Sequence, residues 1–425
     1  MLTRDARGAA VLGGVRLGDL FDVAAGGEAV RTPAYVYDVD AMVAAARELG
    51  RGFGPQSHLI AYAVKANSAG VILRALAEAG CGADVVSGGE LGLALACGIS
   101  PDRILYSGVA KQDPEIDRAI GAGERGILAL EIESVEEIAR VEARAAALGR
   151  IARVSLRIKP GIVADTHAHI ATGHDEAKFG IAQADVPAAF AALAAAPHVR
   201  LVGVGSHIGS QLMRATEYLA AADVLIELAR ERETTHAPLE LVDFGGGFGI
   251  DYGDGSPTPP GEFAEGISAR IARAGLGART AVVEPGRALV GAHGVLCATV
   301  VMTKRSGDRR WLFIDAGMND LLRPALYGAR HRIEPLDQVP PAPGAGRPWA
   351  VAGPVCESSD DFGEHAFDDP PPARVLIRDA GAYGYTMASE YNGRPLPAEI
   401  FLRGGRMVAV TKSRGIAAWI ADRSG

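Results

Sequence analysis

The sequence predicts an α/β protein in which a TIM (β/α)8 barrel is followed by a C-terminal all-β domain. Eight short apolar runs alternate with helical segments between residues 59 and 284, and the pattern becomes β-rich after residue 290. The chain has 425 residues, enough for a barrel of about 250 residues and a second domain. We therefore expect the barrel over residues 36–290 and a β domain formed by residues 1–35 and 291–425.

The eight runs are rich in aliphatic and β-branched residues, and glycine, serine, asparagine or charged residues bound them. They cover residues 59–64, 82–86, 103–108, 126–132, 152–158, 200–206, 239–244 and 280–284. The segments between them are rich in Ala, Leu, Glu and Arg and have helical spacing, and Ser134 followed by Glu137 predicts a capping box at the start of one helix. Eight such alternations favour a closed barrel over an open sheet.

After residue 290 the apolar runs are strand-like, with no convincing helix between them. They cover residues 295–302, 310–317, 349–353, 373–381, 398–404 and 406–412. Gly404 and Gly405 stand between the last two runs and supply the positive φ angles of a two-residue hairpin turn. The first 30 residues contain short strand-like pieces that are compatible with either domain.

Composition and charge exclude several classes of protein. The formal net charge is −8, from 43 basic and 51 acidic residues, which argues against nucleic-acid binding. The apolar runs are shorter than the ~18 residues that span a bilayer, so no membrane association is expected. The four cysteines form no CxxC pair, and HAHIATGH (residues 167–174) lacks a carboxylate at ligand spacing, so no metal site is predicted. A reducing, cytoplasmic compartment fits best.

Polar residues directly follow several of the predicted strands. Catalytic groups of a barrel project from the carboxyl ends of its strands, which selects Lys65, His207, the glycine run 245–247 and Glu284 with Arg287. Desolvation at an apolar barrel mouth would lower the pKa of a lysine from about 10.4 and so favour Schiff-base chemistry. Taken alone, Lys65 is equally compatible with a surface position at a strand end.

The other groups also have structural interpretations. The glycines offer backbone N–H groups to an anion, or form a tight turn. Glu284 requires a hydrogen bond or a cation, and Arg287 in the same EPGR turn is an available partner. Together, however, a reactive lysine, an anion-binding turn, a carboxylate and the flat imidazole of His207 describe a site for pyridoxal phosphate, whose ring nitrogen a carboxylate keeps protonated.

Over residues 35–397 the sequence resembles the fold-type III enzymes that use pyridoxal phosphate and, within them, the diaminopimelate decarboxylase family. The motifs that carry the resemblance are AYAVKAN, GADVVSGGE, KFGI, HIGSQ, DFGGGFGIDY, EPGR, MNDLLRPALY, GPVCESSD and DAGAYGYTMASEYNGRP. The resemblance implies decarboxylation of meso-2,6-diaminopimelate to L-lysine and CO2, the last step of lysine biosynthesis.

The resemblance also implies residue roles at the cofactor. Lys65 would hold the cofactor as a Schiff base, His207 would stack on its pyridine ring, and Glu284 would contact the pyridine nitrogen. The remaining cofactor-binding residues that it implies, several of them around the phosphate, are Ser210, Gly245, Gly246, Gly247, Gly286, Arg287 and Tyr383.

For the substrate, the resemblance implies that Arg287, Arg323 and Tyr327 bind the distal carboxylate, while Tyr383 lines the pocket. Arginine forks suit a carboxylate physically.

Cys356 would donate a proton and Glu357 would bind the distal ammonium, both from the partner subunit of a homodimer. Glu357 discriminates best among substrates, because the eukaryotic-type ornithine decarboxylases have Asp after the equivalent cysteine. Ser359 departs from the family, which usually has glycine there, and the segment after it and the C-terminal end are atypical.

Four alternatives remain open. A related decarboxylase of ornithine, arginine, carboxynorspermidine or a carrier-bound amino acid is disfavoured by Glu357 with Arg323. An activity like that of alanine racemase is disfavoured by the Cys356–Glu357 pair and by EPGR. A non-catalytic homologue that binds pyridoxal phosphate would be expected to lack Lys65 or Cys356, and a Schiff-base aldolase barrel would not explain the glycine run or the β domain.

Overall fold

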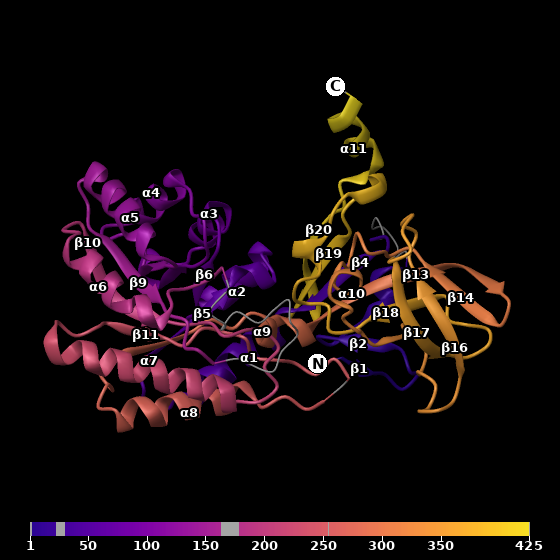
Figure 1. Cartoon of the computed structure of the whole chain (residues 1–425). Helices are drawn as coiled ribbons and strands as arrows, with labels where there is room; N and C mark the ends of the chain where they lie inside the picture. The colour runs from indigo at the N-terminus through magenta and orange to yellow at the C-terminus, as the bar shows by residue number, and fades with distance from the viewer. Residues whose placement is uncertain (1, 23–29, 163–177, 254, 425) are drawn as a thin grey trace. The chain divides into compact units, whose positions relative to one another are not determined.

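Eight parallel strands close into a barrel, as the sequence predicts (Figure 1). The computed structural model describes residues 2–22, 30–162, 178–253 and 255–424. The barrel strands are β5 (His58–Ala63), β6 (Gly82–Val85), β7 (Ile104–Tyr106), β8 (Ala129–Ile132), β9 (Ala152–Arg157), β10 (Val199–Gly205), β11 (Leu241–Asp243) and β12 (Thr280–Val283). Each pairs with the next in this order, and β12 pairs with β5, so all eight predicted strands are confirmed.

The chain divides into two compact units. The barrel unit comprises Val43–Ile250 and Ser256–Ala288, and the β unit comprises Met1–Met42, Asp251–Gly255 and Leu289–Gly425. Helices over the barrel segment are α1 (Val39–Gly52), α2 (Gly70–Glu78), α3 (Gly88–Ala96), α4 (Asp113–Gly121), α5 (Val135–Leu148), α6 (Val186–Ala194), α7 (Thr216–Thr235), α8 (Pro260–Arg273) and α9 (Arg287–Val290). Consecutive helices α3 to α6 contact one another, as do α7 and α8.

Helix α5 begins where the sequence predicts. The Ser134 hydroxyl accepts the backbone N–H of Glu137 at 3.3 Å. The Glu137 carboxylate accepts instead from the backbone N–H of Glu133 (2.8 Å) and from the Lys111 ammonium (2.9 Å). The cap therefore forms, while the carboxylate ties the helix to the preceding loop and to a buried lysine.

Small and aliphatic side chains fill the barrel interior. The interior cluster consists of Leu59, Ala61, Leu105, Ala129, Val202, Leu241 and Val282. Side chains two positions apart on a strand point to the same face. The interior side chains one layer further toward the carboxyl ends of β7, β8, β11 and β12 are therefore Ser107, Glu131, Asp243 and Glu284, all of them buried. The barrel thus ends in a buried acidic layer.

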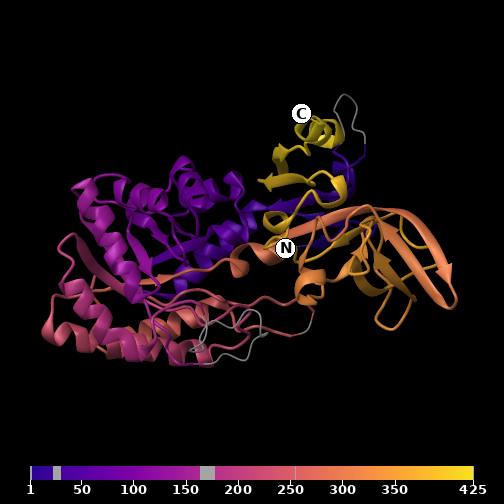
Figure 2. The ribbon, with the colours of Figure 1, turned by 45° about the horizontal axis from the view of Figure 1, so that its top comes forward.

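The β unit contains one large sheet of complex order (Figure 2). Its strands are β4 (Ala34–Asp38), β13 (Gly294–Ser306), β14 (Arg309–Ile314), β15 (Ile333–Pro335), β16 (Arg347–Ala352), β17 (Asp361–Phe367), β18 (Arg374–Ile377), β19 (Ala398–Arg403) and β20 (Arg406–Thr411). The path runs β17-β16-β14-β13-β4-β19-β20, and β18 pairs with β13 and β15. The predicted hairpin between β19 and β20 is confirmed, with Gly404 and Gly405 at φ 60° and 70°.

The prediction that no helix lies between the later strand-like runs is wrong. A short helix, α10, covers Arg323–Tyr327, and α11 covers Gly415–Ser424. Helix α11 lies after the last of these runs, begins at Gly415 (φ 73°) and contains three alanines, which have high helix propensity. Strand β17 was also missed, because its exposed face is charged and its sequence lacks an apolar run.

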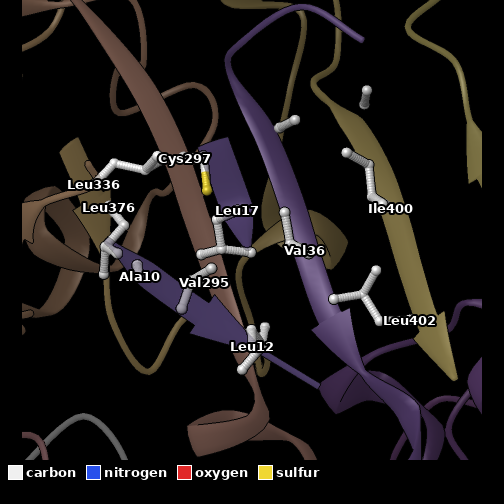
Figure 3. Close-up of a cluster of buried hydrophobic side chains, with 12 residues drawn as sticks. Ala10, Leu12, Leu17, Val36, Val295, Cys297, Leu336, Leu376, Ile400 and Leu402 are labelled. Atoms are coloured by element: carbon white, nitrogen blue, oxygen red, sulfur yellow. The ribbon is translucent and has the colours of Figure 1, made fainter. Parts of the chain in front are cut away.

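The N-terminal pieces join the β unit. They form a small sheet of β1 (Thr3–Arg4), β2 (Ala10–Leu12) and β3 (Val15–Arg16). Figure 3 shows their apolar side chains against those of the large sheet. The shared cluster contains Ala10, Leu12, Leu17, Ala34, Val36, Val295, Cys297, Leu336, Leu376, Ala398, Ile400 and Leu402. This packing resolves the placement that the sequence left open.

Two expectations from composition can also be compared with the structure. Within the described residues, no helix has the length and apolar character required to cross a bilayer. All four cysteines are free, three of them buried and Cys356 exposed.

We expect Leu12→Ala to destabilise the protein by about 2–5 kcal/mol, because it leaves a cavity in this cluster, where Leu12 is fully buried. Urea denaturation measures the effect. The matched control is Val301→Ala on β13, where the side chain is 64% exposed, and we expect a change within about 0.5 kcal/mol. Equal effects of the two substitutions would show that the N-terminal sheet does not stabilise the β unit.

Candidate active site

The carboxyl end of the barrel brings together the ionisable groups that the sequence selects. Lys65 lies in a 3-10 turn, Val64–Ala66, directly after β5. Glu284 directly follows β12, which pairs with β5, and His207 lies two residues after β10. Because the strands are parallel, these three side chains extend from the same end of the barrel.

The Lys65 ammonium is ion-paired. Its Nζ donates to Oδ2 of Asp84 at 2.6 Å, and Asp84 is fully buried. The Ser107 hydroxyl donates to the other oxygen, Oδ1, at 2.6 Å and lies 3.4 Å from Oε1 of Glu284. The expectation of an apolar mouth around Lys65 is therefore wrong, because Asp84, at the end of β6, provides a buried carboxylate. The pair fixes the position of the amine.

His207 is a neutral imidazole. The backbone N–H of Gly246 donates to its Nδ1 at 3.2 Å, so that nitrogen carries no proton. Burial, together with the nearby charges of Arg157 and Lys65, holds the pKa of His207 well below its usual value. The approach of Nδ1 to Oε2 of Glu284 at 3.8 Å is consequently not an ion pair. A neutral ring suits stacking on an aromatic cofactor.

Glu284 is a buried carboxylate without a cation bonded to it among the described contacts. Burial and the negative charge of Asp84 raise the pKa of Glu284 to about 7, although Lys65 and Arg157 act in the opposite direction. The structural alternative of a Glu284–Arg287 pair is not found. Arg287 Nη2 donates to the Ser210 hydroxyl at 3.1 Å, which brings together two of the predicted cofactor-binding residues.

The glycine run after β11 packs its backbone closely against neighbouring loops. A Cβ on Gly246 would lie 2.0 Å from the carbonyl oxygen of Glu284, and one on Gly247, at φ 103°, would lie 2.3 Å from that of Gly209. Gly245 donates its N–H to Oδ1 of Asp243 at 2.8 Å. The run is therefore a closely packed loop, which is compatible with a phosphate beside it. A strand-to-helix turn is not found there, because the next helix, α8, begins only at Pro260. Gly286 is buried next to Glu284.

In the β unit, Arg323 is held by aromatic and imidazole groups. It begins α10 and is 7% exposed. Its Nη1 lies 2.7 Å from Nε2 of His331, and its guanidinium lies 4.7 Å from the ring centre of Tyr252. His331 Nδ1 lies 2.8 Å from the carbonyl oxygen of Arg378, which only accepts. His331 therefore carries its proton on Nδ1 and accepts from Arg323 at Nε2.

Tyr327 ends the same short helix and is half-buried. Tyr383 is half-buried at φ 55°, in the left-handed region that a non-glycine residue seldom adopts. Such a backbone marks a constrained turn, and turns of this kind concentrate at functional sites.

Cys356 and Glu357 are both exposed. The Cys356 backbone N–H donates to the Asn392 side chain at 2.9 Å, and the Tyr391 hydroxyl donates to Glu357 Oε1 at 2.5 Å. Asn392 itself has φ 56°. The EYNGRP segment thus holds the Cys-Glu loop in one conformation.

The predicted residues therefore form three groups. Lys65, His207 and Glu284 lie together in the barrel with the glycine turn and the Arg287–Ser210 pair, Arg323 and Tyr327 share α10, and Cys356 and Glu357 share a loop. The sequence reading missed several polar partners within these groups, namely Asp84, Ser107, Glu131, Arg157, Asp243, His331 and Asn392. The partners on barrel strands could have been found from the alternation of side chains along each strand, because that period of two places them on the interior face.

The residues present fit pyridoxal phosphate. Glu284 offers a buried carboxyl with a pKa of about 7 and no bonded cation, which suits a ring nitrogen able to carry a proton. Lys65 offers a positioned amine to an aldehyde, and His207 offers a neutral flat ring. The Ser210 and Arg287 side chains supply donors for a phosphate.

Metal binding was excluded from the sequence on spacing, and the histidine-rich segment 167–174 lies outside the described residues. Among those that the structure describes, Glu131, Asp243 and Glu284 have carboxylate oxygens within 4.8 Å of one another, a grouping compatible with an ion. Lys65 and Arg157 lie close enough to Glu284 to act on it electrostatically.

Comparison with known proteins identifies the family. Residues 39–291 match the family model for the pyridoxal binding domain of pyridoxal-dependent decarboxylases. The diaminopimelate decarboxylase of Zymomonas mobilis is 40% identical over 397 residues, covering 92% of each chain, and that of Neisseria meningitidis serogroup A is 39% identical over 89% of this chain and 91% of its own.

Solved structures give the same result. The diaminopimelate decarboxylase of Helicobacter pylori, complexed with L-lysine, has a TM-score of 0.85 at 36% identity and covers 93% of this chain and 97% of its own. That of M. jannaschii, also with L-lysine, has a TM-score of 0.90 at 30% identity and covers 99% and 97%. This chain belongs to the diaminopimelate decarboxylase family, whose members are pyridoxal-dependent decarboxylases.

Proposed function

We propose that this chain is a carboxy-lyase that uses pyridoxal phosphate to convert meso-2,6-diaminopimelate to L-lysine and CO2. The observation that carries the proposal is the grouping of an ion-paired lysine, a neutral histidine and a buried glutamate at one end of the barrel. The relatives named above support the substrate. Bound pyridoxal phosphate supplies an electron sink for the bond that breaks at the amino acid's α-carbon.

Lys65 is the residue that would hold the cofactor through its ε-amino group, and Asp84 orients that amine from a buried position. Arg287 and Ser210, already hydrogen-bonded to each other, would bind the phosphate beside the glycines 245–247 and Gly286. His207 would lie against the ring face with its proton on Nε2. Glu284 would face the ring nitrogen and share a proton with it.

Arg323 would bind the substrate carboxylate that is retained in the product. His331 and Tyr252 hold its guanidinium from two sides, which reduces the entropy lost when a carboxylate binds. Tyr327 on the same helix and Tyr383 would be further substrate-binding residues, as would Arg287 of the barrel unit. A positioned guanidinium favours a substrate with a second carboxylate over ornithine or arginine.

Cys356 would return a proton to the carbon that has lost its carboxylate, and Glu357 would bind the distal ammonium. Both are exposed in the single chain, and their loop is held by Asn392 and Tyr391. We propose that they act in the site of a second copy, so the working enzyme is a homodimer. Its free cysteines suit a reducing cytoplasm.

The experiment that tests the activity is CO2 release by protein loaded with pyridoxal phosphate. The substrates, at equal concentration, are meso-diaminopimelate, ornithine, arginine, carboxynorspermidine, L-lysine and D-alanine. We expect release from meso-diaminopimelate to exceed release from every other compound by at least tenfold. Preferential release from another amino acid would contradict the substrate, and release from none, with cofactor bound, would contradict the enzymatic assignment.

We expect Lys65→Ala to abolish both turnover and the visible absorption band of lysine-bound cofactor, because the substitution removes the amine that Asp84 positions directly after β5. Absorption spectra and CO2 release measure the two effects. The matched control is Lys304→Ala, an exposed lysine on β13, which we expect to retain both. Turnover by Lys65→Ala comparable to the control would rule out the assigned role.

We expect Arg323→Gln to weaken inhibition by L-lysine about tenfold or more, since a hydrogen-bonded charged partner contributes roughly 1.5–3 kcal/mol. Inhibition by cadaverine, which lacks the carboxylate, should change by less than about threefold. Inhibition constants for both compounds measure the contrast, with the exposed Arg330→Gln as the matched control. Equal weakening of both inhibitors would show that the arginine maintains the fold of the pocket rather than binding the carboxylate.

A further inference from the structure

Three carboxyl groups lie together beneath the cofactor site. Glu131 lies on β8, Asp243 is the last residue of β11 and Glu284 directly follows β12. The three residues are 3%, 1% and 6% exposed. One oxygen of each lies within 4.8 Å of the others. Gly205 on β10 makes this possible, because a Cβ there would lie 2.7 Å from Oε1 of Glu131.

The cations of this region are already paired with other carboxylates. Lys65 bonds to Asp84 at 2.6 Å, and Arg157 bonds to Glu133 at 2.9 Å. His207 is neutral. Oε1 of Glu131 and Oδ2 of Asp243 are buried, and no N–H, hydroxyl or cation donates to them among the described residues. Three negative charges at such distances and burial are electrostatically prohibitive, so the cluster requires protons or a cation.

A metal ion fits poorly. Mg²⁺ and Ca²⁺ take six or more oxygen ligands, whereas the cluster supplies one oxygen from each of three side chains. The ammonium of Lys65 and the guanidinium of Arg157 also lie close enough to act electrostatically on Glu284, and would repel a metal cation. Protons satisfy the carboxyls without this repulsion.

We propose that Asp243 and Glu131 are positioning residues that carry protons, so that the cluster retains one negative charge, on Glu284, matched to the one positive charge of a protonated ring nitrogen. This inference rests on the proposed function for the identity of that cation. Asp243 is suited to the role, since Oδ1 accepts the N–H of Gly245 at 2.8 Å and leaves Oδ2 to donate to Glu284.

The order of ionisation agrees with this arrangement. Burial and the neighbouring carboxylates hold the pKa values of Glu131 and Asp243 well above their usual range. The pKa of Glu284 rises only to about 7, because Lys65, Arg157 and a hydrogen bond from Asp243 favour its ionised form. The charged or titratable groups that face the cluster among the described residues are Lys65, Asp84, Glu133, Arg157, His207 and Tyr218.

The first measurement is infrared difference spectroscopy of the apoprotein at neutral pH, which does not depend on activity or on the cofactor. We expect a protonated-carboxyl C=O band that weakens in both Asp243→Asn and Glu131→Gln. Asp308→Asn, an exposed residue in the turn between β13 and β14, is the matched control and should leave the band intact. A band unchanged in both cluster variants, or a stoichiometric metal in the purified protein, would overturn the proposal.

The second measurement connects the cluster to the cofactor. Asp243→Ala removes the donor to Glu284, so we expect pyridoxal phosphate to bind about tenfold more weakly. The pH transition of the bound cofactor's absorption should also move upward, because Glu284 then ionises at higher pH. Asp243→Asn keeps an acceptor for Gly245 and a donor for Glu284. We therefore expect its dissociation constant for pyridoxal phosphate to lie, on a logarithmic scale, at least halfway back from the Asp243→Ala value to the wild-type value. Weaker binding of pyridoxal phosphate by Asp243→Asn than by Asp243→Ala would show that Asp243 acts as an anion and would contradict the proposal.

These outcomes separate the two hypotheses. Failure of CO2 release with the infrared result intact would reject the proposed reaction and keep the protonated cluster. If Asp243→Ala does not fold, as judged by circular dichroism, Asp243→Asn and Glu131→Gln still decide the protonation state.

Discussion

Burial of acidic side chains at one end of the barrel is the constraint on which the rest of the site depends. A carboxylate removed from water needs a cation, a proton or strong hydrogen bonds. Asp84 obtains the Lys65 ammonium and the Ser107 hydroxyl, and Glu133 obtains the Arg157 guanidinium and two backbone N–H groups. His207 stays neutral partly for an electrostatic reason, because the nearby cations Arg157 and Lys65 disfavour a further positive charge on its ring.

Much of this architecture follows from the sequence. The eight barrel strands are visible because buried parallel strands are almost continuously apolar, and Lys65 and Glu284 stand directly after two of them. Asp243 and Glu131 were not predicted as site residues, because each lies inside a strand-like apolar run. A single acidic residue in such a run does not by itself indicate a function. Only the closed barrel shows that strands distant in the chain place these two acids against Glu284.

The β unit is harder to predict from the sequence than the barrel. Some of its strands, such as β17, are largely exposed and contain charged residues, so they carry no apolar signal. The position of His331 beside Arg323 depends on a chain reversal after α10, and the hold of Asn392 on Cys356 joins segments 36 residues apart. Contacts of this kind depend on tertiary structure, and local propensity does not encode them.

Strand β4 lies in the middle of the large sheet, between β13 and β19. It is made near the start of the chain, whereas its neighbours include residues from 294 onward and from 398 onward. During synthesis on the ribosome, one edge of β4 must therefore stay unpaired until β13 follows the whole barrel, and the other edge until β19 has been translated. The barrel is complete by residue 284, so it can fold first, and the exposed strand is a natural binding site for a chaperone in the interval.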